Sequence, residues 1–192
     1  MGALVWGWYR WRAAMVAAAQ PNAAHLDVAA LSDDGHALTV VTQNVDDLHE
    51  RGGARDVLHL HGRLLASRCI GCGARVTRET PPACAVCGAA FRPDVVWFGE
   101  SLPTDAWDAA AIAVDACDLL VVVGTSSLVW PAAGLPERAV RAGRPVLEIN
   151  PQATPLSSRA AAHWPLTATA GMAQLRARLQ RTPDDPRRVF AT

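Results

Sequence analysis

Four of the five cysteines form two C-x-x-C pairs, a spacing typical of metal ligands. Cys69 and Cys72 make the first pair, and Cys84 and Cys87 make the second after eleven further residues. Each pair supplies two thiolates to one tetrahedral ion, so the pattern predicts a zinc site. Four thiolates leave no open position, which indicates a structural ion. Buried thiols or redox couples are the alternative, but neither pair precedes a helix as a thioredoxin-like motif does.

Two histidines, His59 and His61, stand just before the first cysteine pair in the segment LHLHG. Because four thiolates already complete a tetrahedral site, these imidazoles are free for other chemistry. Side chains alternate along a strand, so a strand over residues 58–60 places both rings on one face. Only His61 stands at the end of that strand, before Gly62, where a side chain can reach a cleft. The alternative is that both rings are hydrogen-bonded and structural.

Apolar, β-branched runs alternate with Ala-rich segments along the chain. The predicted strands cover residues 38–42, 58–60, 119–123, 146–149 and 164–168. The predicted helices cover residues 4–19, 23–31, 105–116, 131–142 and 171–180. This alternation predicts the α/β class, with a parallel, doubly wound sheet covered on both faces. Several strands end in polar residues or glycine, which is where α/β enzymes place their chemistry.

Length, charge and cysteine content restrict the class of protein. A chain of 192 residues is long enough for one domain, or for a domain with a small inserted module. Eighteen basic and eighteen acidic residues cancel, which argues against a nucleic acid or an anionic membrane as partner. Paired cysteines of this kind favour metal binding in a reducing compartment, so we expect a cytoplasmic protein. The N-terminal apolar run is too short for a membrane span, and its tryptophans do not suit a signal peptide.

Several segments occur in one order that resembles the sirtuin family of NAD-dependent protein deacylases. They are TQNVDDLHERGG, LHLHG, the two cysteine pairs, RPDVVWFGE, VVVGTSS and LEINP. The resemblance implies a Rossmann-type NAD-binding domain at residues 1–61 and 99–180, with a zinc-binding module inserted at 62–98. Residues 4–31 would contribute to the acyl pocket, and residues 181–192 would form a loose tail. The implied cofactors are NAD and one structural zinc ion.

The resemblance also implies roles for individual residues. His61 matches the catalytic base, which takes a proton from a ribose hydroxyl, and the four cysteines match the zinc ligands. The residues implied in NAD binding are Gln43, Asn44, Val45, Asp46, Gly124, Thr125, Ser126, Asn150, Pro151, Gln152 and Ala168. The segment implied to pair with the substrate peptide comprises Val96, Trp97, Phe98 and Gly99.

Tyr9 and Arg12 stand three residues apart, so on a helix they share one face. They match the Y-x-x-R pattern of sirtuins that remove succinyl, malonyl or glutaryl groups, where a phenol and a guanidinium hold the distal carboxylate. The implied function is removal of succinyl or malonyl groups, and also acetyl groups, from protein lysines, giving nicotinamide and O-acyl-ADP-ribose. A solvated arginine on an amphipathic helix is the alternative for this pair.

Sirtuins begin with a strand and a glycine-rich loop that receives the NAD pyrophosphate, and this sequence has no such segment. We therefore expect a doubly wound sheet that lacks its first strand–helix unit, and weak activity if the 192 residues are the complete protein. Two alternatives stay open. One is a weak or inactive module that binds zinc and nucleotide, and the other is an NAD-dependent ADP-ribosyltransferase. No sequence pattern indicates an oligomeric state.

Overall fold

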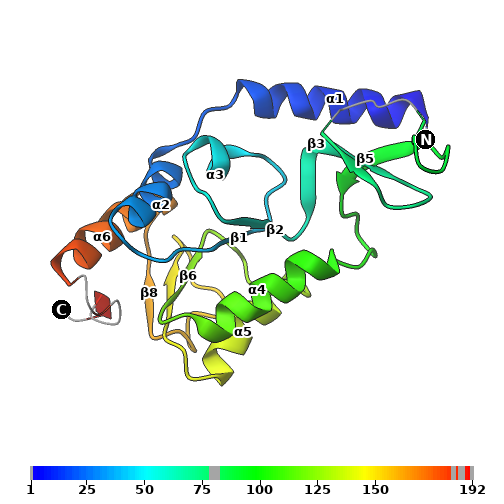
Figure 1. The fold of residues 1–192 in the computed structure, drawn as a ribbon. Helices are drawn as coiled ribbons and strands as arrows, with labels where there is room; N and C mark the ends of the chain where they lie inside the picture. Colours follow the sequence, from blue (N-terminus) through cyan, green and yellow to red (C-terminus); the bar gives the residue numbers. More distant parts are fainter. Residues whose placement is uncertain (1, 78–82, 183–184, 186–188, 191–192) are drawn as a thin grey trace.

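The computed structural model describes residues 2–77, 83–182, 185 and 189–190 (Figure 1). Its helices are α1 (Ala3–Ala18), α2 (Ala23–Asp33), α3 (Leu48–Arg51), α4 (Thr104–Ala116), α5 (Gly134–Arg141) and α6 (Ala168–Arg181). Its strands are β1 (Val40–Thr42), β2 (Val57–His59), β3 (Gly62–Cys69), β4 (Arg75–Val76), β5 (Phe91–Val95), β6 (Leu120–Val123), β7 (Val146–Ile149) and β8 (Ala162–Trp164).

The parallel strands lie in two sheets, β1–β2 and β6–β7–β8. Val41 lies opposite Leu58 in the first sheet, and Val122 lies opposite Glu148 in the second. Among the described strands, none joins β1 to β6 by a ladder of hydrogen bonds. The predicted α/β class with parallel strands is confirmed, and the gap between the two sheets agrees with the expectation of a sheet without its first strand.

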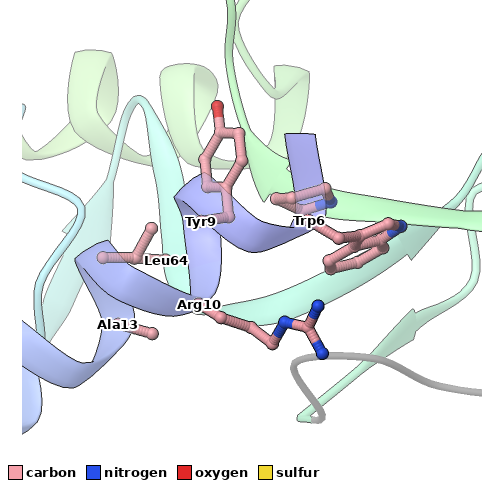
Figure 2. Close-up of a pocket in the computed structure, with 6 residues that line it drawn as sticks. Trp6, Tyr9, Arg10, Ala13 and Leu64 are labelled. Carbon is pink, nitrogen blue, oxygen red and sulfur yellow. The ribbon is translucent and has the colours of Figure 1, made fainter. Parts of the chain in front are cut away.

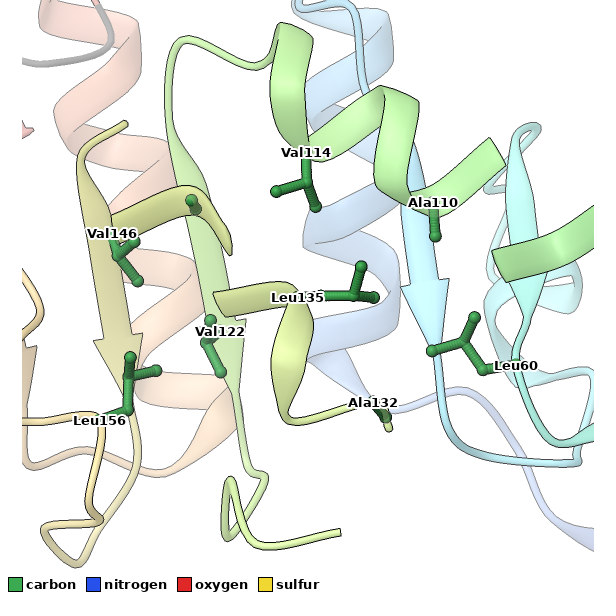
Figure 3. Packing of buried hydrophobic residues seen from close by; sticks show 9 residues of the cluster. Leu60, Ala110, Val114, Val122, Ala132, Leu135, Val146 and Leu156 are labelled. Carbon is green, nitrogen blue, oxygen red and sulfur yellow. The ribbon is translucent and has the colours of Figure 1, made fainter. Parts of the chain in front are cut away.

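Helices cover both faces of the β6–β7–β8 sheet, as the buried strand sequences require. On one face, α4 and α5 pack over Val146 and its neighbours (Figure 3). On the other face, α2 and α6 pack over Leu147 and Ile149. All four residues of β7 are buried, so successive side chains fill opposite cores. Because both faces of the sheet are buried, the ends of β6 and β7 are held in place. The predicted nucleotide-binding residues follow directly after these two ends.

A smaller antiparallel sheet, in the order β4–β3–β5, carries the cysteine pairs. Helix α1 lies beside this sheet in Figure 1 and contacts β3. Trp6 of α1 packs against a small core made by Cys69, Cys84 and Phe91. At the other end of α1, Arg51 of α3 donates hydrogen bonds to the carbonyl oxygens of Val16 and Ala19, at 3.1 and 2.6 Å. Through these contacts α1 spans from the cysteine module to α3 (Figure 1).

Two predictions of element position are wrong, each for a local reason. The last strand covers Ala162–Trp164 rather than 164–168, because Pro165 lacks the N–H that a ladder requires. Thr167 then caps α6, accepting a hydrogen bond from the Ala170 amide, so the helix begins at Ala168. Most other boundaries agree within two residues, although α5 begins at Gly134, three residues later than predicted.

The predicted loose tail differs from the structure where the structure describes it. Val189 is fully buried with α2 and α6, and Phe190 packs against the same cluster. Arg178 of α6 donates a hydrogen bond to the Val189 carbonyl oxygen at 2.7 Å. Residues 183–184, 186–188 and 191–192 lie outside the described part. None of the helices in the described residues combines the length and apolar character that crossing a membrane requires.

Gly171 provides a test of the packing between α6 and β7. A Cβ added there would lie 2.2 Å from Cγ2 of Ile149. We expect Gly171→Ala to lower the free energy of unfolding by about 1–3 kcal/mol, because overpacking exceeds the gain in helix propensity. Gly7→Ala in α1 is the control, since nothing lies within 4 Å of its added Cβ, and it should be stabilising by about 0.5–1 kcal/mol. Urea unfolding measures both, and equal stabilities would contradict this packing.

Candidate active site

The sulfur atoms of Cys69, Cys72, Cys84 and Cys87 lie within 4.8 Å of one another. The pair distances include 3.4 Å between the sulfurs of Cys69 and Cys87, and 3.7 Å between those of Cys72 and Cys84. A tetrahedral zinc ion with Zn–S bonds of about 2.3 Å requires sulfur separations of roughly 3.8 Å. The cluster is therefore compatible with one zinc ion, as the spacing predicts.

Backbone amides prepare this cluster for a cation. The amides of Cys72 and Gly71 donate hydrogen bonds to the Cys69 sulfur and lower the pKa of that thiol to about 6. The Ala89 amide acts in the same direction on Cys87, but the surrounding sulfurs raise the pKa of Cys87 to about 12. Four thiols this close cannot all ionise without a cation between them. Zinc binding would therefore release protons, and zinc affinity should weaken as the pH falls.

His61 lies in the turn between β2 and β3, just beyond the strand predicted for it, and is half-buried. Its Nδ1 lies 3.0 Å from the carbonyl oxygen of Gln43. A carbonyl only accepts, so Nδ1 carries the hydrogen and Nε2 keeps its lone pair. The turn needs glycine at residue 62, where φ is +79° and an added Cβ would lie 2.0 Å from the Asp94 carbonyl oxygen. The arrangement presents one basic nitrogen in a fixed orientation.

His59 differs from His61, because both of its ring nitrogens have partners. Its Nε2 lies 2.8 Å from Oε1 of Glu50, and its Nδ1 lies 3.3 Å from the Asn44 carbonyl oxygen. Burial raises the pKa of Glu50, but the His59 hydrogen bond, a backbone hydrogen bond and the charges of His59 and Arg63 together outweigh it, and the net shift is downward. His59 is also buried, with 7% of its surface exposed. It therefore has no nitrogen left to act on a ligand, and its role is structural.

Three of the predicted nucleotide residues meet although they follow three different strands. The Gln43 amide donates to the Thr125 hydroxyl at 3.4 Å, and this contact joins the two parallel sheets. The Asn150 amide donates to the Thr125 carbonyl oxygen at 2.8 Å. His61 joins this set, because its ring contacts the Gln43 carbonyl oxygen. Hydrogen bonds therefore connect His61, Gln43, Thr125 and Asn150 in one chain. The strand ends thus converge on a single polar edge.

The other predicted nucleotide residues lie in the loops around this edge. Asp46 lies just before α3 and accepts a hydrogen bond from the Leu48 amide, and the Asn150 side chain accepts one from the Gln152 amide. Gly124 ends β6 with a φ of +62°, which favours glycine. Ala168 is the first residue of α6. The remaining members of the set stand in the same loops and are Asn44, Val45, Ser126 and Pro151.

Ser127, which sequence reasoning missed, stands at the same edge. It is the only non-glycine residue with positive φ in the described chain, at 56°. Its hydroxyl is buried and has no hydrogen-bond partner within the described residues. A strained residue with an unpaired buried hydroxyl fits a loop that completes its hydrogen bonds on a ligand. Its position in GTSS, directly after two predicted contacts, is the signal that could have found it.

Glu148 was also missed, although its charge within the apolar run VLEI is a clear signal. Its side chain is fully buried and accepts hydrogen bonds from the hydroxyls of Thr154 and Ser157. The Leu156 amide in turn donates to the Thr154 hydroxyl at 3.1 Å. A carboxylate that receives two hydroxyls folds the loop back onto β7. This loop carries Asn150 at its start.

The segment predicted to meet the substrate peptide begins where β5 ends. The Val96 amide donates to the His61 carbonyl oxygen at 2.9 Å, so the segment lies directly beside the candidate base. Trp97 is 37% exposed and Phe98 is fully exposed. Gly99 has a φ of +86°, which turns the chain back toward Glu100. Val96 is therefore bound to His61, and residues 97–99 are open to solvent.

A buried ion pair holds this turn in place. Arg92 of β5 has 8% of its surface exposed, and its guanidinium donates to both carboxylate oxygens of Glu100. Because Arg92 donates these hydrogen bonds, the pKa of Glu100 lies below its usual value despite burial. The Trp97 amide also donates to Glu100, at 3.0 Å. Sequence reasoning missed this pair, since residues eight apart carry no periodic signal.

Tyr9 and Arg12 both lie on α1, half-buried. They are connected through Trp8, whose ring meets the Tyr9 ring edge-on at 4.8 Å and lies 5.2 Å from the Arg12 guanidinium carbon. Among the described residues, no carboxylate pairs with Arg12. Tyr9 borders a small pocket between α1, β3 and β5 (Figure 2), lined by Trp6, Tyr9, Arg10, Ala13, Leu64 and Pro93.

Together, the fold and site define a nucleotide-binding α/β protein with an inserted four-cysteine module that is compatible with zinc. Residues 2–131 match the Sir2 family. A relative from Mycolicibacterium smegmatis, named NAD-dependent protein deacylase Sir2, is 48% identical over 191 residues, covering 94% of this chain and 78% of that protein. The chain belongs to the Sir2 family.

Solved structures agree with this assignment. A Sir2 homolog in complex with NAD is 43% identical, with a TM-score of 0.85, covering 92% of this chain and 72% of that one. A Sir2 complex with a p53 peptide and NAD+ is 31% identical, with a TM-score of 0.73, covering 86% of this chain and 71% of that one. The resemblance to the sirtuin family that the sequence motifs indicate is therefore confirmed.

The metal site can be tested by removing one ligand. We expect the purified chain to carry about one zinc ion, and Cys84→Ser to lose it because three thiolates hold the ion less tightly than four. Cys117→Ser is the matched control. Burial raises the pKa of the Cys117 thiol, which donates to the Val114 carbonyl oxygen and lies outside the cluster. Mass spectrometry of metal content decides, and zinc retained by Cys84→Ser would refute the site.

Proposed function

We propose that this chain removes acyl groups from lysine side chains of proteins, using NAD as co-substrate. The observation that carries the proposal is the single free imidazole nitrogen of His61, fixed by the Gln43 carbonyl at the polar edge shared with Thr125 and Asn150. Membership of the Sir2 family and the name of its relative support the same activity. We expect nicotinamide and O-acyl-ADP-ribose as products, and a cytoplasmic location.

The residues at the polar edge suit a dinucleotide. Amide groups of Gln43 and Asn150 can donate to and accept from ribose hydroxyls, and the unpaired Ser127 hydroxyl offers a further contact. When bound, NAD supplies the ribose carbon that the acyl oxygen attacks as nicotinamide leaves. Nε2 of His61 then takes the proton of a ribose hydroxyl, while the Gln43 carbonyl stabilises the imidazolium that forms. Imidazole is the side chain that most often serves as a general base near neutral pH.

We propose that the substrate peptide lies against residues 96–99 as an added strand. The Val96 amide binds the His61 carbonyl oxygen, and residues 97–99 are exposed. Backbone pairing accepts many sequences, so target choice would be broad. Family members differ in the acyl group they remove, and the chain's own residues bear on that choice.

We further propose a preference for succinyl and malonyl groups, with acetyl groups also accepted. Arg12 supports it, because the residue is half-buried and its guanidinium has no carboxylate partner in the described residues. An unpaired guanidinium next to a phenol is a suitable receptor for a distal carboxylate. An acetyl group offers no such charge, so it would gain nothing from the pair.

Replacing His61 tests the proposed base. We expect His61→Ala to abolish turnover of a succinyl-lysine peptide, because the variant lacks the nitrogen proposed to take the ribose proton. Zinc content should be unchanged, since the ring lies outside the cysteine cluster. His36→Ala, in the connection between α2 and β1, is the control and should keep its activity.

Mass spectrometry with NAD separates the candidate functions. O-acyl-ADP-ribose indicates deacylation, a heavier protein target indicates ADP-ribosyl transfer, and no change indicates a binding module. Near-normal deacylation by His61→Ala would refute the assignment of the base.

Replacing Arg12 tests the acyl preference. A charge-assisted hydrogen bond contributes about 1.5–3 kcal/mol, so we expect Arg12→Met to reduce kcat/KM for a succinyl peptide roughly 10- to 100-fold, with a much smaller change for the acetyl peptide. Arg55→Met is the control, because Arg55 is exposed, pairs with Asp33 and lies outside the pocket that Tyr9 borders. Equal losses on both peptides would remove the proposed preference.

A further inference from the structure

We propose that Trp97 is a specificity-determining residue, because its indole N–H makes the Tyr9 hydroxyl a hydrogen-bond donor toward the distal carboxylate of the acyl group. The inference rests on the proposed preference for acidic acyl groups. Tyr9 and Trp97 stand 88 residues apart in the chain, so only the folded structure brings them together.

The direction of the hydrogen bond follows from the chemistry of the two groups. Nε1 of Trp97 lies 2.6 Å from the Tyr9 hydroxyl oxygen. An indole nitrogen donates and does not accept, so the phenol oxygen must be the acceptor. The hydrogen of that hydroxyl is then left for a second partner. No second partner occurs within the described residues, so the donor stays free for a ligand.

Two contacts hold the Trp97 ring in position, one from Arg92 against the face of the ring and one through the backbone amide of Trp97. The Arg92 guanidinium carbon lies 3.5 Å from the centroid of the ring, a close cation–π contact. Arg92 cannot move away, because it is buried and bound to Glu100, which also binds the Trp97 amide. The indole N–H therefore points at Tyr9 with little rotational freedom. Little conformational entropy is then lost at the Tyr9 hydroxyl when substrate binds.

Ring contacts along α1 also connect Tyr9 to Arg12, the charged residue of the Tyr9–Arg12 pair. The Tyr9 ring meets Trp8 edge-on, and Trp8 lies under the Arg12 guanidinium. Tyr9 thus offers a directed O–H and Arg12 offers charged N–H groups, and neither offers a free acceptor. Two donors without an acceptor favour a carboxylate, whereas the methyl of an acetyl group cannot accept either hydrogen bond. Trp97 therefore acts on the selection between acyl groups through Tyr9.

Trp97→Phe is the sharpest test, because it keeps an aromatic ring at residue 97 while it removes the N–H together with the fused second ring of the indole. We expect the ratio of kcat/KM for succinyl over acetyl peptides to fall about 3- to 10-fold, in line with the loss of one hydrogen bond. Any loss of peptide pairing affects both substrates and cancels in the ratio. Trp11→Phe is the control, because its indole is exposed on α1 and the ratio should not change.

A double-mutant cycle distinguishes action through Tyr9 from a general structural effect. In a Tyr9→Phe background, Trp97→Phe should produce no further fall in the ratio, because the hydroxyl it orients is gone. A ratio that is unchanged by Trp97→Phe alone, or falls equally in both backgrounds, would overturn the proposal.

A spectroscopic measurement keeps the proposal testable if catalysis is slow. Tyr9 is the only tyrosine of the chain, so fluorotyrosine labelling gives a single fluorine NMR signal. Trp97→Phe should shift that signal in the free protein, and a succinyl-lysine peptide should shift it more than an acetyl-lysine peptide does in the wild type. A signal indifferent to Trp97→Phe would refute the hydrogen bond itself. A wild type with no preference between the peptides, but a signal that responds to Trp97→Phe, would instead refute the proposed acyl preference.

Discussion

The site depends on one hydrogen bond, between Nδ1 of His61 and the carbonyl oxygen of Gln43. A backbone carbonyl cannot donate, so this contact alone decides which imidazole nitrogen is basic. His59, two residues earlier, shows the contrast, because partners on both nitrogens leave it no free lone pair. The rest of the fold holds Gln43 and His61 at this distance, since each follows one of two paired parallel strands.

The cysteine module and the parallel sheets meet at this hydrogen bond. Strand β3 starts at Gly62, directly after the candidate base, and ends at Cys69 in the metal cluster. It pairs with β5, whose continuation gives the Val96 amide to the His61 carbonyl oxygen. A structural ion at one end of this ladder therefore stabilises the segment proposed to hold substrate at the other end.

Charge is distributed unevenly across the proposed substrate site. Arg92 is neutralised by Glu100 and serves to fix the turn, whereas Arg12 has no carboxylate partner in the described residues. A half-buried cation without a partner lowers the free energy of unfolding. An anion that binds between the cation and the oriented hydroxyl would offset that loss. Aromatic rings at Trp8 and Trp97 hold both donors in place without supplying acceptors that would compete with a ligand.

The sequence alone determined the α/β class, the four-sulfur cluster and the family, because alternating apolar runs and fixed local spacings carry these features. It also placed the candidate residues at strand ends. Only the tertiary structure decided which of them meet, since the contact of Gln43 with Thr125 and that of Trp97 with Tyr9 join residues 82 and 88 positions apart. The same holds for the burial of Val189 in the predicted loose tail. Local pattern fixes which groups are available, and packing over long sequence separations fixes their partners and the direction of each hydrogen bond.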